Sequence, residues 1–268
     1  MASSGPASSN PFTDLTDSRK CNIREEALPL ELPGRIALLN QIKVCGKEKN
    51  LSKARRLHSK ILQNNLFMKD VYVTTALVAT YAKCGSLSKA RDVFDWLPLR
   101  DVVSWNTLIG GLVVDSESCE EAFKCFNWMQ LEGIFPDPLT FVCILRACAN
   151  LCNAAKGSIF HMQIMQMKLK KDIFVRNTLV DMYAKCGLVL DAQKSFNELP
   201  SHDVVSWNAL ISGYAEHGPF EEALKCFDRM ELCDVIHDAT TFVSTLKACA
   251  NLGNIHKGHE IHQKIKRK

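Results

Sequence analysis

The sequence predicts an all-α protein, an α-solenoid built from tandem helix-turn-helix units. Three observations carry this prediction. First, long segments recur 101 or 102 residues apart: DVVSWNTLIGG, which begins at Asp101, returns as DVVSWNALISG from Asp203. Second, within each recurring stretch the apolar residues follow the spacing of one helix face, and short Gly- or Pro-containing breaks separate the helical patterns. Third, two short helices cannot bury their apolar faces alone, so neighbouring units must stack on one another.

The first 34 residues precede the repeats and break their pattern. The start, MASSGPASSNPFTDLTDSRK, lacks the apolar run of a signal peptide. Its Ser-rich composition is compatible with an organelle transit peptide, although Asp14, Asp17, Glu25 and Glu26 are atypical of one. We therefore expect residues 1–34 to be a leader that is either a targeting segment or disordered.

The repeats occupy the rest of the chain. Three further pairs of segments keep the long offset: EEAFKCFNWM with EEALKCFDRM, TFVCILRACANL with TFVSTLKACANL, and TALVATYAKCGSL with NTLVDMYAKCGLV. Each complete unit ends in Asp. The expected units are 35–70, 71–101, 102–137, 138–172, 173–203, 204–238 and 239–268, the last of which is truncated about five residues short of its counterpart.

Each unit is predicted to form two helices. In 204–238 the run WNALISGYAE is broken by HGP and resumes as FEEALKCFDRM, and in 71–101 the run ALVATYAK is broken by CGS before LSKARDVFDWL. Unit 102–137 has one residue more, because LVVDSESCEEA stands where YAEHGPFEEA stands later. That insertion falls at the turn between helices, where it is tolerated.

Composition restricts the classes of function only loosely. A net charge of +4 permits an anionic partner but does not require one. No stretch approaches the roughly 18 apolar residues of a membrane span. Of the twelve cysteines, seven recur at repeated positions and no CxxC spacing appears, so we expect buried free thiols and no metal site.

The units resemble pentatricopeptide repeats of the plant type that alternates standard, long and short repeats (the PLS subclass). Standard repeats are represented by VVSWNxLIxG with EEAxKCFxxM, short ones by NTLVDMYAKCGLVLDAQKSFNELPSHD, and long ones by TFVxxLxACANL followed by His161 or His262. The match covers about residues 35–268. It implies a right-handed superhelix whose first helices line a groove for single-stranded RNA, with one repeat for each nucleotide.

The resemblance also implies which residues read the bases, namely the fifth and the last residue of each repeat. These pairs are Leu39 with Asp70, Thr75 with Asp101, Asn106 with Asp137, Val142 with Asp172, Asn177 with Asp203, and Asn208 with Asp238, while Val243 has no partner within the sequence. Asn offers donors and acceptors, and Asp only acceptors, whereas Val and Leu cannot distinguish hydrogen-bonding edges. By the family code, Thr–Asp favours G and Asn–Asp favours U, which implies a preference for N-G-U-N-U-U-N from 5′ to 3′.

Each of these residues also has a structural interpretation. A hydrogen bond between repeats would explain an Asn inside a helix, since Asn is a poor helix former, and an Asp before a helix is equally an N-cap. We expect Trp105 and Trp207 to pack in the core. Four recurring lysines either approach phosphates or lie on a solvated face; they are Lys83, Lys124, Lys185 and Lys225.

No enzyme is expected within this sequence. Relatives of the subclass carry a deaminase-like domain that needs His-x-Glu and Pro-Cys-x-x-Cys, and neither motif occurs. The histidines of IHKGHEIH belong to a repeat, so we interpret them as surface and expect no cofactor. Only four of seven repeats carry a readable pair, so we expect the chain to act with further protein, such as a deaminase or other editing factor in trans.

The function expected from these features is that of a sequence-selective RNA-binding protein of a mitochondrion or chloroplast. It would serve as a specificity factor for C-to-U editing or transcript maturation. Two alternatives stay open. One is a protein–protein scaffold that uses the solenoid groove, which would not need Asn or Thr at one repeated position. The other is a non-functional gene fragment.

Overall fold

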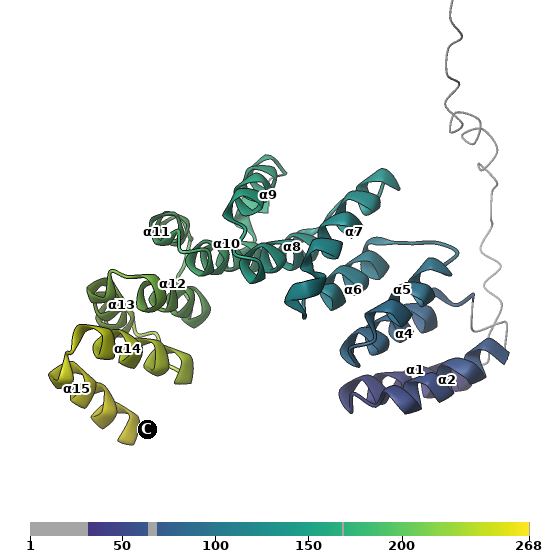
Figure 1. Ribbon diagram of the computed structural model, residues 1–268, viewed down its shortest axis with the longest axis horizontal. Helices are drawn as coiled ribbons and strands as arrows, with labels where there is room; N and C mark the ends of the chain where they lie inside the picture. Colours follow the sequence, from purple (N-terminus) through teal and green to yellow (C-terminus); the bar gives the residue numbers. More distant parts are fainter. Residues whose placement is uncertain (1–31, 64–68, 168, 268) are drawn as a thin grey trace, which may run out of the picture.

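The protein is an arched row of stacked helix pairs (Figure 1). The computed structural model describes residues 32–63, 69–167 and 169–267, and those residues contain helices and turns but no strands. The expected leader therefore lies outside the described residues, apart from its last three residues, which belong to the first helix. The all-α solenoid predicted from the repeats is confirmed.

The helices follow one another in pairs along the described part of the chain. In order they are α1 (Leu32–Lys47), α2 (Leu51–Gln63), α4 (Val71–Lys83), α5 (Leu87–Asp95), α6 (Val102–Leu112), α7 (Cys119–Leu131), α8 (Pro138–Asn150), α9 (Ala154–Gln166), α10 (Ile173–Lys185), α11 (Val189–Asn197), α12 (Val204–His217), α13 (Phe220–Leu232), α14 (Ala239–Leu252) and α15 (Ile255–Lys266), with short 3₁₀ turns at Ser116–Ser118 and Leu169–Lys171.

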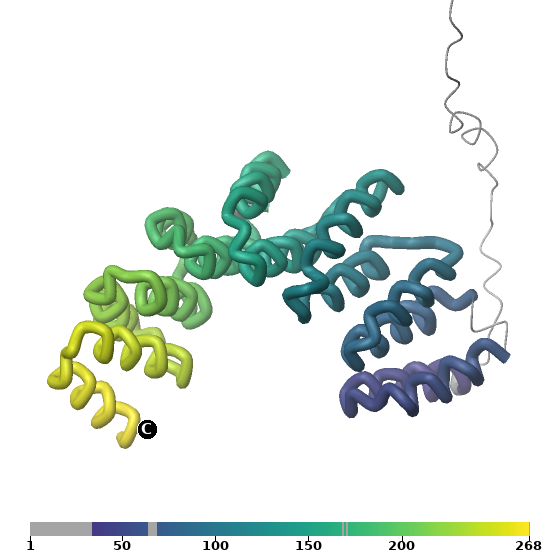
Figure 2. Tube along the Cα trace, viewed as in Figure 1, coloured from purple at the N-terminus to yellow at the C-terminus, as the bar shows by residue number. Residues whose placement is uncertain are grey.

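The first helix of each pair packs on the first helix of the next. α1, α4, α6, α8, α10, α12 and α14 thus form one continuous row, and each second helix packs on its own first helix and on the next one along the row. α7, α9 and α11 lie on the outer side of the arch, and the trace of Figure 2 follows the same order from end to end. The row of first helices therefore presents a repeating surface with one helix per unit.

The Asp that ends each unit is the N-cap of the helix that follows. Asp101, Asp137, Asp203 and Asp238 each form a capping box with a Ser or Thr three residues later, and Asp70 and Asp172 cap α4 and α10. Such a cap stabilises a helix by about 0.5–2 kcal/mol relative to Ala. Each unit boundary is consequently a local helix start signal.

The core runs without interruption along most of the row because each unit packs its aromatic residues on the previous one. The indole of Trp105 packs edge-on against Phe94 at 4.6 Å between ring centroids, and Trp207 repeats this with Phe196 at 4.7 Å. Both indoles are almost fully buried. The packing role expected for the two tryptophans is confirmed.

Small residues allow the first helices to approach closely. A Cβ added at Gly111 would lie 2.5 Å from the Cβ of Ala82, and one added at Gly213 would lie 2.7 Å from the Cβ of Ala184. No side chain fits at such a separation without moving a helix. Gly111 and Gly213 are thus required for the close packing of each first helix on the preceding one.

Five of the seven repeated cysteines are buried free thiols, as the sequence predicts, whereas Cys84 and Cys186 are only half-buried. Burial raises the pKa of Cys125 and of Cys148 to about 12. By contrast, Cys152 and Cys233 are exposed. Within the described ranges we find no cluster of three or more His, Cys, Asp or Glu side chains able to hold a metal, and no helix there has the length and apolarity to span a bilayer.

Candidate nucleic-acid interface

The fifth and last residues of three units lie in direct contact. Asn106 Nδ2 donates to Asp137 Oδ1 at 2.9 Å. Asn177 Nδ2 donates to both carboxylate oxygens of Asp203, at 3.1 and 2.9 Å. These pairs lie at the seam between one first helix and the next, because the Asp caps the following helix. Residues that are 31 or 26 positions apart in the sequence are therefore joined by direct hydrogen bonds.

The third pair repeats this geometry further along the row. Asn208 Nδ2 donates to both oxygens of Asp238 at 3.0 Å. Burial alone would raise the pKa of Asp238, but hydrogen bonds from Thr241 and Asn208 outweigh it and lower that pKa below its usual value. The carboxylate is consequently ionised at neutral pH and accepts hydrogen bonds only.

A hydroxyl completes two of the three pairs, and the sequence did not predict it. Thr140 Oγ1 donates to Asn106 Oδ1 at 2.6 Å, and Thr241 Oγ1 donates to Asn208 Oδ1 at 2.6 Å. Both threonines are the third residue of the following unit and also form its capping box. Since Asp accepts and Thr donates, the Asn amide has one favoured orientation, with its NH2 group toward the carboxylate.

The middle pair lacks this hydroxyl. Ser206 occupies the equivalent capping position and bonds only with the backbone and side chain of Asp203. Asn177 Oδ1 is buried without a hydrogen-bond partner in the described structure. In all three pairs the NH2 group of Asn thus donates to the Asp carboxylate, but the pairs differ in whether the Asn amide oxygen accepts a hydrogen bond.

The accessible part of each pair is mainly the carboxylate. Asn106 and Asn177 are each 6% exposed and Asn208 is half-buried, whereas Asp203 and Asp238 are exposed. Asp137 is half-buried, and within the described chain its Oδ2 takes part in no hydrogen bond. A ligand would therefore meet an acceptor on Asp beside the remaining N–H of Asn.

The other predicted pairs are not joined. Between Thr75 and Asp101, residues that the structure describes in full, there is no hydrogen bond, and Asp101 only caps α6. Val142 is half-buried and Asp172 caps α10 through Val175 N. The apolar residue of this pair has no polar atom that could engage its Asp.

The first and last positions differ again. Arg35 forms an ion pair with Asp70 through Nε at 2.6 Å and Nη2 at 3.1 Å, so the carboxylate predicted to act with Leu39 is already paired, and Asp70 is only 8% exposed. Sequence reasoning missed this ion pair. Val243, at the other end, is 68% exposed.

An apolar row accompanies the pairs and was also missed. The second residue of a unit lies three positions before the fifth, on the same face of the first helix. In six units this residue is apolar or aromatic and more than half exposed; the six are Ile36, Tyr72, Val103, Leu139, Phe174 and Val205. The recurrence of exposed apolar residues at one position of successive units was the signal that could have revealed the row.

Family models match the repeats directly. A model of the PPR repeat family matches residues 100–150 and 202–251, and a model of the PPR repeat matches residues 174–204. The chain belongs to the pentatricopeptide repeat family. The resemblance read from the motifs is thereby confirmed at the level of the family.

Plant pentatricopeptide repeat proteins resemble the chain over most of its length. The chloroplastic pentatricopeptide repeat-containing protein At4g18520 of Arabidopsis thaliana is 36% identical over 236 residues, which cover 88% of this chain and 38% of that protein. The mitochondrial protein At3g02330 of the same plant is 35% identical over 238 residues, 81% of this chain and 26% of that protein. This chain spans less than two fifths of either relative.

The fold is also that of a solved pentatricopeptide repeat protein. PPR10 from maize superposes with a TM-score of 0.67 at 20% identity, over 86% of this chain and 34% of PPR10. PPR10 in complex with an 18-nt psaJ RNA element gives a TM-score of 0.72 at 22% identity, over 84% of this chain and 34% of PPR10. At this identity the likeness establishes the fold.

The recurring lysines of these pentatricopeptide repeats are mostly ion-paired. Lys124 bonds Glu121, Lys185 bonds Asp181 and Lys225 bonds Glu222, each within its own helix. Lys83 is exposed at the end of α4. Such exposed pairs are weak, so these lysines can exchange their partner for a phosphate at small cost.

Proposed function

We propose that this chain binds single-stranded RNA with one repeat per nucleotide and the preference N-G-U-N-U-U-N. The observation that carries the proposal is the set of three Asn–Asp pairs held at the α6–α8, α10–α12 and α12–α14 seams of the helix row. The proposed readers are Thr75, Asn106, Val142, Asn177 and Asn208, each with the Asp that ends its repeat.

The chemistry of an Asn–Asp pair suits uracil. The free N–H of the Asn amide can donate to a uracil carbonyl oxygen, while the Asp carboxylate can accept from the uracil N3–H. Cytosine presents an acceptor at N3 and an amine at C4, so it would face both groups with the wrong polarity. An oriented amide beside an ionised carboxylate therefore favours U over C.

The exposed apolar row supplies the second half of an RNA site. Side chains such as Tyr72 and Phe174 offer faces on which bases can stack without regard to sequence. They lie on the same helix face as the fifth residues, three positions earlier. A base placed between two successive members of this row would bring its Watson–Crick edge toward the Asn–Asp pair.

The biological setting is proposed by similarity. The similar proteins At4g18520 and At3g02330 are chloroplastic and mitochondrial respectively, and PPR10 was crystallised with RNA. We therefore place this chain in a mitochondrion or chloroplast, as a PLS-type specificity factor for C-to-U editing or transcript maturation. Its role is binding, and a deaminase or other editing factor in trans would supply the chemistry.

A change of base preference tests the proposal. The full chain is titrated with a short RNA containing GUNUU, and Asn106→Thr is compared with wild type on RNAs that carry U or G at the base read by that repeat. The expected result is a change of preferred base from U to G. Asn127→Thr, an exposed substitution on α7, is the matched control and should leave the preference at U.

Two outcomes would refute it. Absence of RNA binding by the wild-type chain would favour the protein scaffold. Equal loss of affinity on both RNAs by Asn106→Thr would show that Asn106 supports the fold and does not read a base.

A further inference from the structure

Four units carry a hydroxyl residue at their third position, and this residue completes the cap of the first helix. Its side-chain oxygen accepts a hydrogen bond of 2.9–3.1 Å from the backbone N–H of the Asp that ends the preceding unit. A hydroxyl has one proton, so each of these residues can donate one further hydrogen bond. All four are fully buried; they are Ser104, Thr140, Ser206 and Thr241.

The two serines donate this proton within their own cap. Ser104 Oγ donates to the backbone carbonyl of Asp101 at 2.8 Å, and Ser206 Oγ donates to that of Asp203 at 2.9 Å. Because serine is not β-branched, its side chain can turn freely about χ1 toward this carbonyl. The proton is then not available to a residue of the neighbouring first helix.

The two threonines donate the proton across the seam. Thr140 Oγ1 lies 2.6 Å from Asn106 Oδ1, and Thr241 Oγ1 lies 2.6 Å from Asn208 Oδ1. Two oxygens at this distance require a proton between them, and only the hydroxyl can supply it. The same hydroxyls lie 2.9 and 3.1 Å from the Asp carboxylates, but those oxygens already accept from a backbone N–H and from the Asn amide.

This difference decides how firmly each Asn amide is held. The amides of Asn106 and Asn208 are fixed at both ends, by a carboxylate at the NH2 group and by a threonine at the oxygen. Asn177 is fixed by Asp203 alone, because its buried Oδ1 has no hydrogen-bond partner in the described structure. An amide held at one end turns over more readily, and it then presents an oxygen where a uracil carbonyl needs an N–H.

We propose that Thr140 and Thr241 are positioning residues that set the selection of uracil over cytosine by Asn106 and Asn208. This inference rests on the function proposed above for the Asn–Asp pairs. The serine at position 206 has the opposite effect, so the base read by Asn177 is the least strictly selected of the three uracils. The third residue of one unit thus tunes the base that the preceding unit reads.

Capping alone does not account for threonine at these two seams. Ser104 and Ser206 form the same capping box as Thr140, so the cap does not need the additional methyl group. At the seam of Ser104 the fifth residue of the preceding unit is Thr75, which has no amide to orient. Ser104 is therefore the reference position, where serine can be exchanged for threonine without an Asn beside it.

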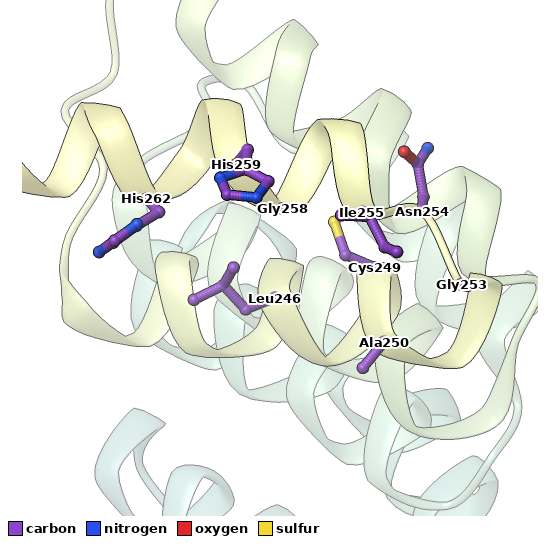
Figure 3. Close-up of a pocket in the computed structure, with 9 residues that line it drawn as sticks. All are labelled: Leu246, Cys249, Ala250, Gly253, Asn254, Ile255, Gly258, His259 and His262. Atoms are coloured by element: carbon purple, nitrogen blue, oxygen red, sulfur yellow. The ribbon is translucent and has the colours of Figure 1, made fainter.

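Thr241 can be changed without altering the pocket beside the other half of α14. That pocket lies between α14 and α15, has a volume of about 420 Å³, and is lined from α14 by Leu246, Cys249 and Ala250 (Figure 3). Thr241 lies in the first turn of α14 and does not line it. An effect of Thr241→Ser on base selection would therefore arise at the seam with α12.

The ratio of the affinities for U and C at one base tests the proposal. The full chain is titrated with GUNUU RNAs that have one fixed base at N and in which one uracil at a time is replaced by cytosine. In wild type the ratio should be smaller at the base read by Asn177 than at those read by Asn106 and Asn208. Thr140→Ser should lower the ratio about three- to tenfold at the Asn106 base alone, the equivalent of one hydrogen bond, and Thr241→Ser should do so at the Asn208 base.

The reverse substitution completes the experiment. Ser206→Thr supplies the missing hydroxyl and should raise the ratio at the Asn177 base about three- to tenfold. It should also raise the urea midpoint of the RNA-free chain, because the buried oxygen of Asn177 gains a donor. Ser104→Thr is the matched control; it should leave the ratios at all three uracils as in wild type and raise the midpoint less than Ser206→Thr does.

The outcomes separate this inference from the function on which it rests. A wild-type chain that binds no RNA, or that does not prefer U to C at the Asn106 and Asn208 bases, would overturn both. Where wild type does prefer U there, ratios unchanged by Thr140→Ser and Ser206→Thr, or an equal loss of affinity for the U and C RNAs, would overturn the positioning role alone. Local changes of the ratio in opposite directions support it.

Discussion

Replacing Asp137 by Ala should destabilise the protein more than replacing Asp101. Both residues cap a first helix with the same geometry, through hydrogen bonds of 2.8 Å from the backbone N–H of Thr140 and of Ser104 respectively. Only Asp137 also receives a hydrogen bond from an Asn, at 2.9 Å from Asn106. Asp101→Ala is therefore a matched control that removes a cap alone.

The magnitude follows from these contacts. Loss of a cap costs about 1 kcal/mol of unfolding free energy. Asn106 is only 6% exposed, so its amide would lose a partner that water replaces poorly, which costs a further 1–3 kcal/mol or so. We expect about 2–4 kcal/mol for Asp137→Ala and about 1 kcal/mol for Asp101→Ala.

Urea unfolding followed by circular dichroism at 222 nm measures the difference. The comparison is valid where the unfolding free energy of each variant falls with urea concentration at the wild-type slope, since a changed slope would indicate partial unfolding of the array. Equal destabilisation by the two substitutions would refute the reasoning, because it would mean that the Asn106–Asp137 bond contributes nothing to the fold.

Three further predictions concern packing, thiols and pH. Gly111→Ala should lower the unfolding free energy by about 1–3 kcal/mol, because the added Cβ has no room beside α4. Gly110→Ala, whose Cβ would have its nearest neighbour 3.5 Å away, should raise the unfolding free energy by about 0.5–1 kcal/mol, because Ala favours a helix more than Gly does; thermal melts compare the two variants. Iodoacetamide at pH 8, followed by mass spectrometry, should label the exposed Cys152 well before Cys125, because the raised pKa of Cys125 keeps this buried thiol protonated. Equal labelling rates at the two cysteines would contradict this. The stabilising effect of Asp238, whose pKa is lowered in the folded protein, should be present above the usual Asp pKa of about 4 and be lost as the pH falls through the lowered value. Urea midpoints measured from pH 7 to pH 2 should therefore fall less steeply in Asp238→Asn than in wild type, and parallel curves would contradict the assignment.

Much of the fold could be predicted from the sequence because it is a sum of local signals. The Asp that ends a unit is a helix cap, the Gly-containing turns separate helices, and recurrence at one offset requires the units to stack. The pairing of Asn106 with Asp137 was predictable through the family resemblance. It was not predictable from residue chemistry alone, because the two residues come from different units.

The contacts that the sequence did not indicate all cross a seam between helices. Thr140 is visible as a capping residue, but its hydroxyl reaches Asn106 only because α6 and α8 lie side by side. The ion pair of Arg35 with Asp70 likewise joins α1 to the start of α4. Nothing in a periodic pattern specifies which side chain of one helix meets which side chain of the next.

By itself, then, the sequence determined that the chain is a row of helix pairs and which residues begin each helix, because capping, turn formation and amphipathic spacing act over a few residues. The tertiary structure alone decided that the Asn amides are oriented and that Asn177 lacks the hydroxyl its counterparts have. These properties depend on distances across the packed seams, which are set when the helices stack.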